Sequence, residues 1–155
     1  MRTILALSLG TMTLVADDLQ DELDAFKAKF EASAPAEKIE EYNKGVKAVK
    51  DSGILEQALK VGDTAPDFTL RNHKGEPATL SKLAAEGPVI LTWYRGSWCP
   101  YCNIALRSYQ ENLSKFKEAG AQFVALTPEQ PDKSLSNAEK NELAFQVLTD
   151  TNNEV

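Results

Sequence analysis

The chain is poor in the residues that build several large classes of protein. Two cysteines and one histidine among 155 residues cannot supply a disulfide-dense scaffold, a four-thiolate zinc site or a histidine-rich metal site. Eight glycines and seven prolines exclude a collagen-like repeat and a low-complexity linker. No apolar run reaches the roughly 20 residues that a membrane-spanning helix needs. After these exclusions we expect a folded domain, because 43% hydrophobic residues are sufficient to form a core.

Positive charge is also in deficit. The chain has 17 basic and 23 acidic residues, which gives a net charge of −6. A nucleic-acid-binding module normally carries a basic footprint, so we expect no nucleic-acid partner. The length suits one domain of ordinary size.

The N-terminal residues up to Ala16 resemble a secretory signal peptide. Arg2 supplies one positive charge, and an apolar run extends from Ile4 to Val15. Leu14 stands where a small residue is preferred, so a buried N-terminal element or a later start at Met12 is the alternative. A cleaved leader predicts a periplasmic or secreted protein, whose cysteines can persist as a disulfide. Without cleavage we expect a cytoplasmic protein.

Residues 17–60 predict a helical N-terminal extension. Apolar residues recur at three- and four-residue spacing, which is typical of one helical face: Leu19, Leu23, Phe26 and Phe30, and then Ile39, Tyr42, Val46 and Val49. Pro35 divides the two sets, because proline disfavours a helical conformation for the residue before it. Such short helices depend on tertiary packing for their stability.

The pattern changes at Val61 and then alternates between strand and helix. We expect strands over residues 67–70, 76–80, 88–94, 122–126 and 145–148, and helices over 82–86, 100–119 and 131–144. The nearly continuous apolar stretch 88–94 is typical of a strand buried on both faces of a parallel sheet. Ser81 is expected to cap the first of these helices, and His73 lies in a predicted turn, where we expect it to be solvated. The order predicts an α/β fold with right-handed crossovers.

Both cysteines stand in one motif, Trp98–Cys102, which follows a predicted buried strand and opens a predicted helix. A thiol at a helix N-terminus faces unpaired backbone N–H groups and the positive end of the helix dipole, which favour the reactive thiolate. Cys102 follows Cys99 by three residues and therefore lies on the same helical face. This spacing lets one sulfur attack and the other resolve the product as a disulfide. A thioredoxin-like redox motif is the context that fits.

Alternative structural roles explain the motif less well. A structural disulfide across so short a loop would constrain little of the unfolded chain, and half of a zinc site lacks further ligands. Cys99 is expected to be the more exposed cysteine, because it is nearer to the helix N-terminus. Arg95 is a candidate for stabilising the thiolate electrostatically, with a surface role as the alternative.

Three neighbours complete the candidate site. We expect Ser97, Trp98 and Tyr101 to shape the substrate pocket and its docking surface, with core packing as the alternative role of the two aromatic residues.

Two segments resemble a known family. Val61–Leu70 is similar to the opening signature of the peroxiredoxin (AhpC/TSA) family, and Tyr94–Cys102 resembles the redox segment of its CxxC-containing branch. The helical extension also resembles that branch. The resemblance implies a thioredoxin-like fold, in which a central mixed sheet is flanked by helices. It further implies thiol-dependent reduction of hydrogen peroxide or organic hydroperoxides, with electrons returned by thioredoxin or a similar dithiol donor. No cofactor and no metal is predicted.

The resemblance leaves the order of attack open. If Cys102 corresponds to the attacking cysteine of the family's P-x-x-x-T-x-x-C pattern, Cys99 stands at its threonine and Arg95 at its proline. The thioredoxin-like alignment instead makes Cys99 the attacking thiol and Cys102 the resolving one. We expect both cysteines to be redox-active.

The resemblance also implies further elements after Val155, namely a helix, an antiparallel strand pair and a closing helix. Residues 61–155 are therefore expected to form a domain that is incomplete at its C-terminus. An open sheet edge favours association, so a homodimer is one expected state. Two other functions remain open at this point: a thiol–disulfide oxidoreductase that acts on protein disulfides, and a non-enzymatic redox-sensing remnant.

Overall fold

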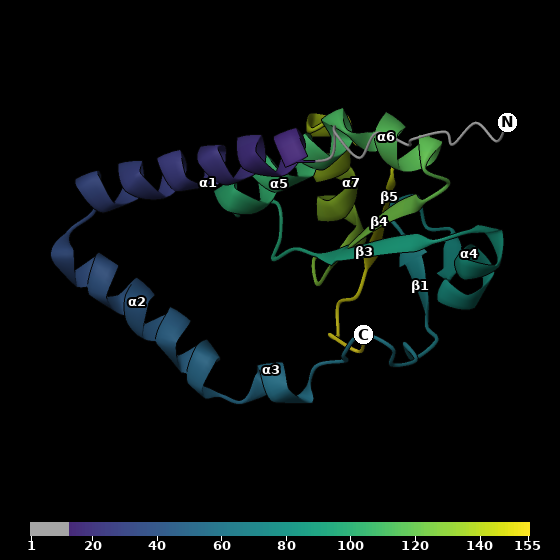
Figure 1. Cartoon of the computed structure of the whole chain (residues 1–155), viewed down its shortest axis with the longest axis horizontal. Helices are drawn as coiled ribbons and strands as arrows, with labels where there is room; N and C mark the ends of the chain where they lie inside the picture. Colours follow the sequence, from purple (N-terminus) through teal and green to yellow (C-terminus); the bar gives the residue numbers. More distant parts are fainter. Residues whose placement is uncertain (1–12) are drawn as a thin grey trace, which may run out of the picture. The chain divides into compact units, whose positions relative to one another are not determined.

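The computed structural model describes residues 13–155 (Figure 1). Two compact units result, one formed by Asp24–Asp67 and the other by Phe68–Val155 together with the stretch that ends at Leu23. Residues 1–12, which hold most of the predicted leader, lie outside the described residues. The leader and the cellular location therefore stay predictions.

The unit over Asp24–Asp67 is helical. It contains the end of α1 (Thr13–Ser33), then α2 (Ala36–Asp51) and α3 (Ile54–Gln57). Pro35 precedes the first turn of α2 with extended backbone, and the rings of Phe30 and Tyr42 lie 6.0 Å apart between the two long helices. Helix α2 buries none of its residues, so little of the predicted apolar face is covered.

The other unit is built on a mixed five-stranded sheet, as the sequence predicts. Its strands are β1 (Thr69–Asn72), β2 (Pro77–Thr79), β3 (Val89–Trp93), β4 (Gln122–Thr127) and β5 (Gln146–Thr149), in the spatial order β2-β1-β5-β4-β3. Strands β3, β4 and β5 are parallel, and β1 is antiparallel to β2 and β5. Its remaining helices are α4 (Leu80–Glu86), α5 (Pro100–Glu111), α6 (Leu113–Glu118) and α7 (Pro131–Lys140).

The position of β3 corrects the sequence prediction. Within the described residues β3 pairs only with β4 and forms an edge of the sheet. Residues 89–92 are half-buried, and Trp93 is 56% exposed. An apolar run indicates that a segment prefers to be buried. The position of the resulting strand in the sheet depends instead on which other strands pair with it.

Three helix boundaries also differ from the prediction. Helix α4 begins at Leu80 with Thr79 before it and no side-chain cap, so Ser81 lies inside the helix. The helix expected over 100–119 is divided at Asn112, whose side chain donates to the Ser108 carbonyl at 2.8 Å. Helix α7 ends at Lys140, and Glu142 then turns the chain with a φ of +50° while the N–H of Leu143 donates back to the Ala138 carbonyl at 2.9 Å.

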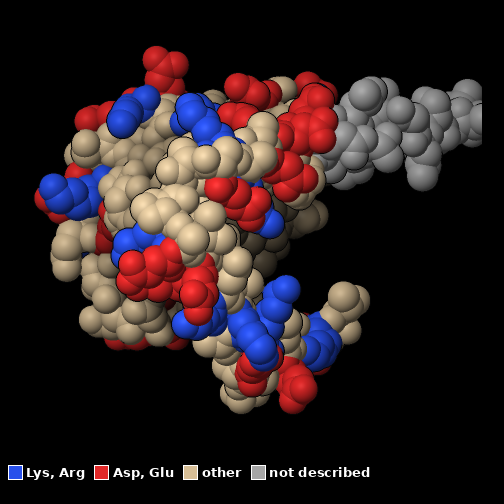
Figure 2. Space-filling view, turned by 90° about the vertical axis from the view of Figure 1, so that its left-hand side faces the viewer, with Lys and Arg blue, Asp and Glu red and all other residues tan. Residues whose placement is uncertain are grey.

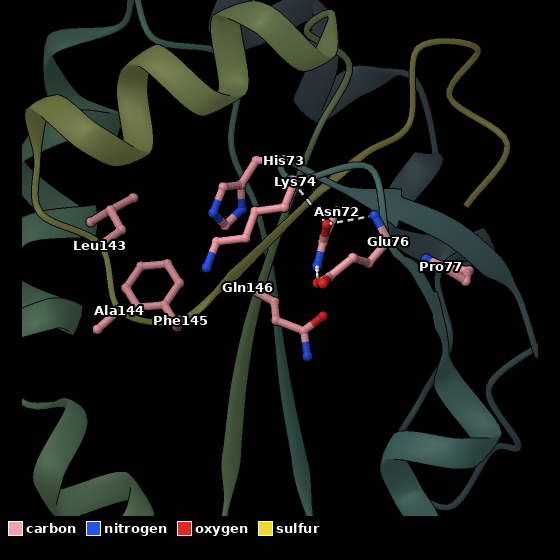
Figure 3. Close-up of a pocket in the computed structure, with 9 residues that line it drawn as sticks. All are labelled: Asn72, His73, Lys74, Glu76, Pro77, Leu143, Ala144, Phe145 and Gln146. Atoms are coloured by element: carbon pink, nitrogen blue, oxygen red, sulfur yellow. Dashed lines mark hydrogen bonds between the residues drawn. The ribbon is translucent and has the colours of Figure 1, made fainter.

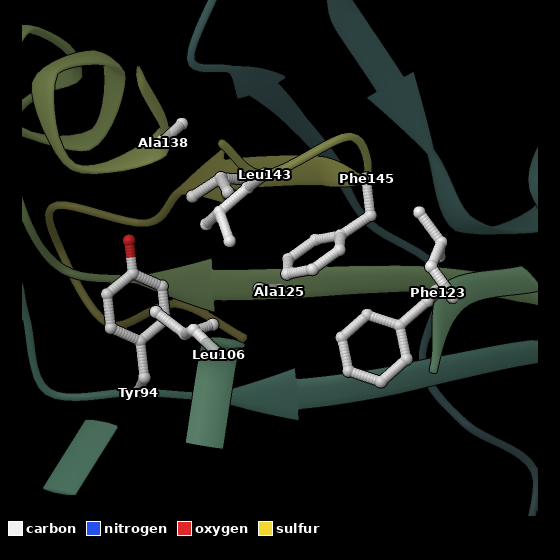
Figure 4. Close-up of a cluster of buried hydrophobic side chains, with 9 residues drawn as sticks. Tyr94, Leu106, Phe123, Ala125, Ala138, Leu143 and Phe145 are labelled. Carbon is white, nitrogen blue, oxygen red and sulfur yellow. The ribbon is translucent and has the colours of Figure 1, made fainter. Parts of the chain in front are cut away.

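The core lies on both faces of the sheet, and β4 contributes to each. Phe123 and Ala125 point into one cluster and Val124 and Leu126 into the other, the alternation that a strand imposes. Figure 4 shows the first cluster, in which Phe123 lies beside Phe145. The ring of Phe123 is within about 5 Å of three others, with centroid distances of 4.9 Å to Tyr109, 5.3 Å to Phe116 and 4.9 Å to Phe145. This packing holds the sheet against α5 and α6.

Residues 13–155 contain neither a membrane-spanning helix nor a cluster of metal-ligating side chains. No helix there is long and apolar enough to cross a membrane, and no group of three or more metal-ligating side chains occurs. Acidic and basic side chains lie interspersed on the face that Figure 2 displays.

Candidate redox site

The cysteine motif lies where β3 ends and α5 begins. Cys99 is the N-cap residue of α5, with extended backbone, and Pro100 occupies the first helical position. Proline suits this position because its missing N–H has no partner within the helix. The Cys99 sulfur accepts a hydrogen bond from the backbone N–H of Cys102 at 3.3 Å, the role that a capping side chain plays at a helix N-terminus.

The two sulfurs lie 2.7 Å apart, and both cysteines are free thiols. Cys99 has 0% of its surface exposed, whereas Cys102 is half-buried. The expectation that Cys99 is the more exposed cysteine is therefore wrong. Its side chain turns back under the first turn of α5 to accept the N–H of Cys102, so the same contact that caps the helix also buries the sulfur.

The hydrogen bonds at the sulfurs separate the pKa values of the two thiols. Burial raises the pKa of Cys99, but donation from the Cys102 thiol, from the Cys102 N–H and from Arg95 outweighs it, and the net pKa is lowered. For Cys102, burial raises the pKa, and its role as donor to Cys99 raises it further. Of the two thiols, Cys99 is therefore the more acidic one.

Arg95 lies directly at the buried sulfur. Its Nη2 donates to Cys99 Sγ at 3.2 Å, and this hydrogen bond raises the pKa of the guanidinium. The guanidinium also lies 5.1 Å from the centroid of the Trp98 ring, within the range of a cation–π contact. Trp98 is 65% exposed, so it is a surface residue rather than a core residue. Tyr101, which follows in the first turn of α5, is half-buried.

Ser97 is held by a residue from a distant part of the chain. Its backbone N–H donates to Glu129 Oε2 at 2.7 Å and its hydroxyl to Glu129 Oε1 at 2.8 Å. Sequence reasoning missed Glu129, which lies in the loop after β4. The order of the elements could have indicated that the loop after β4 lies near the cysteine motif. Strands β3 and β4 are parallel neighbours whose carboxyl ends meet at the same edge of the sheet.

Three asparagines were also missed. Asn103 Nδ2 donates to the carbonyls of Ser97 at 2.8 Å and Cys99 at 3.1 Å. Asn141 Nδ2 donates in turn to Asn103 Oδ1 at 3.2 Å and to Asn137 Oδ1 at 2.8 Å. This network connects the redox loop to α7. An isolated asparagine in a helix gives no sequence signal for such a role.

A cavity of about 500 Å³ lies elsewhere in the same unit (Figure 3). It is at the amino end of β5, whereas the cysteines follow the carboxyl end of the parallel strand β3. His73 lines it, is half-buried, and accepts a long hydrogen bond from the N–H of Val147 at 3.4 Å. The prediction that His73 is simply solvated is thus wrong, because pairing of β1 with β5 places the turn against the sheet. The other lining residues are Asn72, Lys74, Glu76, Pro77, Leu143, Ala144, Phe145 and Gln146.

A cysteine pair at the N-terminus of a helix, after a parallel strand of a mixed sheet, defines a thioredoxin-like fold with a dithiol site. The AhpC/TSA family model matches residues 61–155, and the chain belongs to that family.

Relatives in this family are similar over the same part of the chain. Peroxiredoxin Q of Sedum lineare, a chloroplast protein, is 33% identical over 107 residues, covering 69% of this chain and 56% of its own. Peroxiredoxin Bcp of Escherichia coli K12 is 30% identical over 97 residues, covering 63% of this chain and 62% of its own. The chain thus spans about half to three-fifths of the length of these curated relatives.

Two solved structures share the fold. The peroxidoxin BcpB of Mycobacterium tuberculosis superposes with a TM-score of 0.61 at 29% identity over 63% of each chain. A Bacteroides thetaiotaomicron protein assigned as a protein disulfide isomerase gives a TM-score of 0.52 at 27% identity, over 59% of this chain and 58% of its own.

Proposed function

We propose that this chain reduces hydroperoxides through Cys99 and Cys102 and is recycled by thioredoxin or a similar dithiol donor. The observation that carries the proposal is the convergence of three donors on the Cys99 sulfur, from Arg95, the Cys102 N–H and the Cys102 thiol, all within 3.3 Å. Membership of the AhpC/TSA family and similarity to peroxiredoxins support it.

The chemistry begins at the Cys99 thiolate. Its sulfur attacks one oxygen of the peroxide, the O–O bond breaks, and the products are a sulfenic acid on Cys99 and an alkoxide or hydroxide, which takes a proton. The thiol of Cys102 then attacks the sulfenic sulfur, an S–S bond forms, and the sulfenic oxygen leaves as water. The peroxide is reduced by two electrons, and the dithiol is oxidised to a disulfide.

Access to the reacting sulfur requires a local movement. Cys99 has 0% exposed surface, so a peroxide reaches it only when the side chains above it move aside. The half-buried Cys102 is the more accessible sulfur for an incoming dithiol, which returns the pair to the reduced state by two thiol–disulfide exchanges. The exposed ring of Trp98 lies against the guanidinium of Arg95.

The experiment measures consumption of hydrogen peroxide and of an organic hydroperoxide with a thioredoxin system as the electron source. The wild-type chain is compared with Cys99→Ser, Cys102→Ser and the double variant. Cys102→Ser should still form a sulfenic acid on Cys99, trapped by dimedone and located by mass spectrometry, but it should lose turnover with thioredoxin. Absence of peroxide consumption by the wild-type chain would refute the proposal, and dimedone trapping only on Cys102 would reverse the two roles.

Two observations favour a second function. The Trp98–Cys102 sequence and the similarity to the Bacteroides protein suit a thiol–disulfide oxidoreductase that acts on protein disulfides. Reduction of insulin disulfides by the same four proteins distinguishes the two. Insulin reduction without peroxide turnover selects this second function.

A further inference from the structure

Every backbone and side-chain polar group of Ser97 is engaged by another residue. Its N–H and its hydroxyl donate to the two carboxylate oxygens of Glu129, at 2.7 and 2.8 Å, and its carbonyl accepts from Asn103 Nδ2 at 2.8 Å. Ser97 thus stands between a loop after β4 and the first turns of α5. A residue held on all sides in this way fixes the path of the chain on either side of it.

The residue before Ser97 is a glycine that the close approach of Glu129 requires. Gly96 has a φ of +147°, in the region that other residues rarely adopt. A Cβ atom added there would lie 2.9 Å from Glu129 Cδ and 2.6 Å from Trp98 Nε1. The carboxylate therefore packs against bare backbone, within a loop closed by the hydrogen bond from Cys99 N–H to the Gly96 carbonyl at 3.1 Å.

This loop connects the guanidinium of Arg95 to the sulfur of Cys99, the two groups that form the thiolate contact. Arg95 precedes Gly96 directly, and Cys99 is joined to Gly96 by that hydrogen bond. The guanidinium of Arg95 and the sulfur of Cys99 meet at 3.2 Å. The distance between them therefore depends on the conformation of the intervening residues, where Glu129 binds.

We propose that Glu129 is a positioning residue of the redox site, which holds the Gly96–Ser97 segment so that Arg95 stays on the Cys99 sulfur. The proposal rests on the thiolate role of Cys99 in the proposed function. Glu129 acts through its two hydrogen bonds and not through its charge. A negative charge near a thiolate disfavours that thiolate, so a purely electrostatic role would have the opposite sign.

The two roles predict opposite shifts in the pKa of Cys99 when Glu129 is removed, so this pKa gives a direct test. The rate of alkylation of Cys99 by iodoacetamide is measured against pH in the full chain with Cys102→Ser, so that one thiol reacts. Glu129→Ala should raise the apparent pKa of Cys99 and slow alkylation at neutral pH about tenfold, because one pKa unit changes the thiolate fraction tenfold. Glu129→Gln should stay within about twofold of the parent, since its amide oxygen can accept from the Ser97 N–H and its amide nitrogen can donate to the Ser97 hydroxyl.

Two further variants complete the design. Ser97→Ala removes one of the two hydrogen bonds and should produce a smaller slowing in the same direction. It also decides the question if Glu129→Ala fails to fold. Glu139→Ala, at an exposed position of α7, is the matched control and should leave the rate unchanged.

Alkylation of Cys99 needs no peroxide turnover. A failure of the positioning role can therefore be distinguished from a failure of the proposed function. An unchanged rate in a folded Glu129→Ala variant overturns the positioning role. Faster alkylation in both Glu129→Ala and Glu129→Gln also overturns it, because that result assigns the effect to the charge.

Discussion

The guanidinium of Arg95 donates a hydrogen bond at 3.2 Å to the sulfur of Cys99, which is itself completely buried. Arg95 is an exposed residue in the loop after β3, and its charged guanidinium is the group that reaches the thiol. A cation in this position favours the thiolate over the thiol. Together with the hydrogen bonds from the thiol and the N–H of Cys102, this contact gives a buried cysteine, for which burial alone would favour the neutral form, a lowered pKa.

Removal of that cation should weaken the thiolate. Arg95→Met should raise the pKa of Cys99 and slow its alkylation at neutral pH about tenfold, which corresponds to one pKa unit. Arg107→Ala is the matched control, because Arg107 is an exposed arginine of α5 whose ion pair is with Glu22 at 3.8 Å. Equal rates in the wild type and Arg95→Met would contradict the assigned role of Arg95.

The two thiols should titrate separately in the reduced protein. The absorbance of thiolate at 240 nm, followed against pH, should show one step below the ordinary cysteine value of about 8.5 and one above it. Cys102→Ala should move the remaining step upward, since the Cys99 sulfur then loses the hydrogen bond from the Cys102 thiol. A single step near 8.5 for both thiols would show that the hydrogen bonds at Cys99 do not act as described.

The pKa shifts also predict how stability varies with pH. Below about pH 8.5 the unfolded chain keeps a Cys99 proton that the folded chain has lost, so the free energy of unfolding rises with pH there. Above that pH the folded chain keeps the Cys102 proton that the unfolded chain has lost, so the free energy of unfolding falls.

The measurement for this prediction is a series of urea titrations under reducing conditions. The difference between the wild type and the Cys99→Ser/Cys102→Ser double variant isolates the thiols from other titrating groups. The difference should have a maximum near pH 8.5, and a difference that does not vary with pH would refute the linkage.

The aromatic cluster predicts the largest loss of stability. Phe123 is 5% exposed and packs against Tyr109, Phe116 and Phe145. Phe123→Ala should lower the free energy of unfolding by about 3–5 kcal/mol, the range for truncation of a buried phenylalanine. Leu55→Ala removes a side chain that is 67% exposed and should change the free energy by less than about 0.5 kcal/mol. Comparable losses in the two variants would contradict the assigned core.

Much of the fold could be predicted because its signals are local. The apolar run over 122–126 predicts a strand, and the structure confirms it as β4, which is buried on both faces of the sheet. The same kind of run in β3 led to a wrong prediction, since β3 lies at an edge of the described sheet. The two segments differ in their neighbours in space, which sequence patterns do not report.

The candidate site likewise has residues that local sequence signals predicted and residues that they did not. Cys99, Cys102 and Arg95 lie within eight consecutive residues, so a motif and the rule for helix N-termini brought them together. Glu129 contacts Ser97 across 32 residues of chain, and no local pattern connects them. The expectation about exposure of Cys99 failed because a rule about position along a helix does not include the direction in which a side chain turns.

By itself, the sequence determined that this protein has a dithiol site at the start of a helix in an α/β fold, because residue spacing and backbone capping are local properties. Only the tertiary structure decided that Cys99 is the buried and more acidic thiol. Only the tertiary structure, too, placed Arg95 on its sulfur and held the loop between them with Glu129. Glu129 reaches the loop because the ends of the parallel strands β3 and β4 lie side by side. The burial of Cys99 and its contact with Arg95 depend on the directions in which side chains turn, which residue spacing does not give.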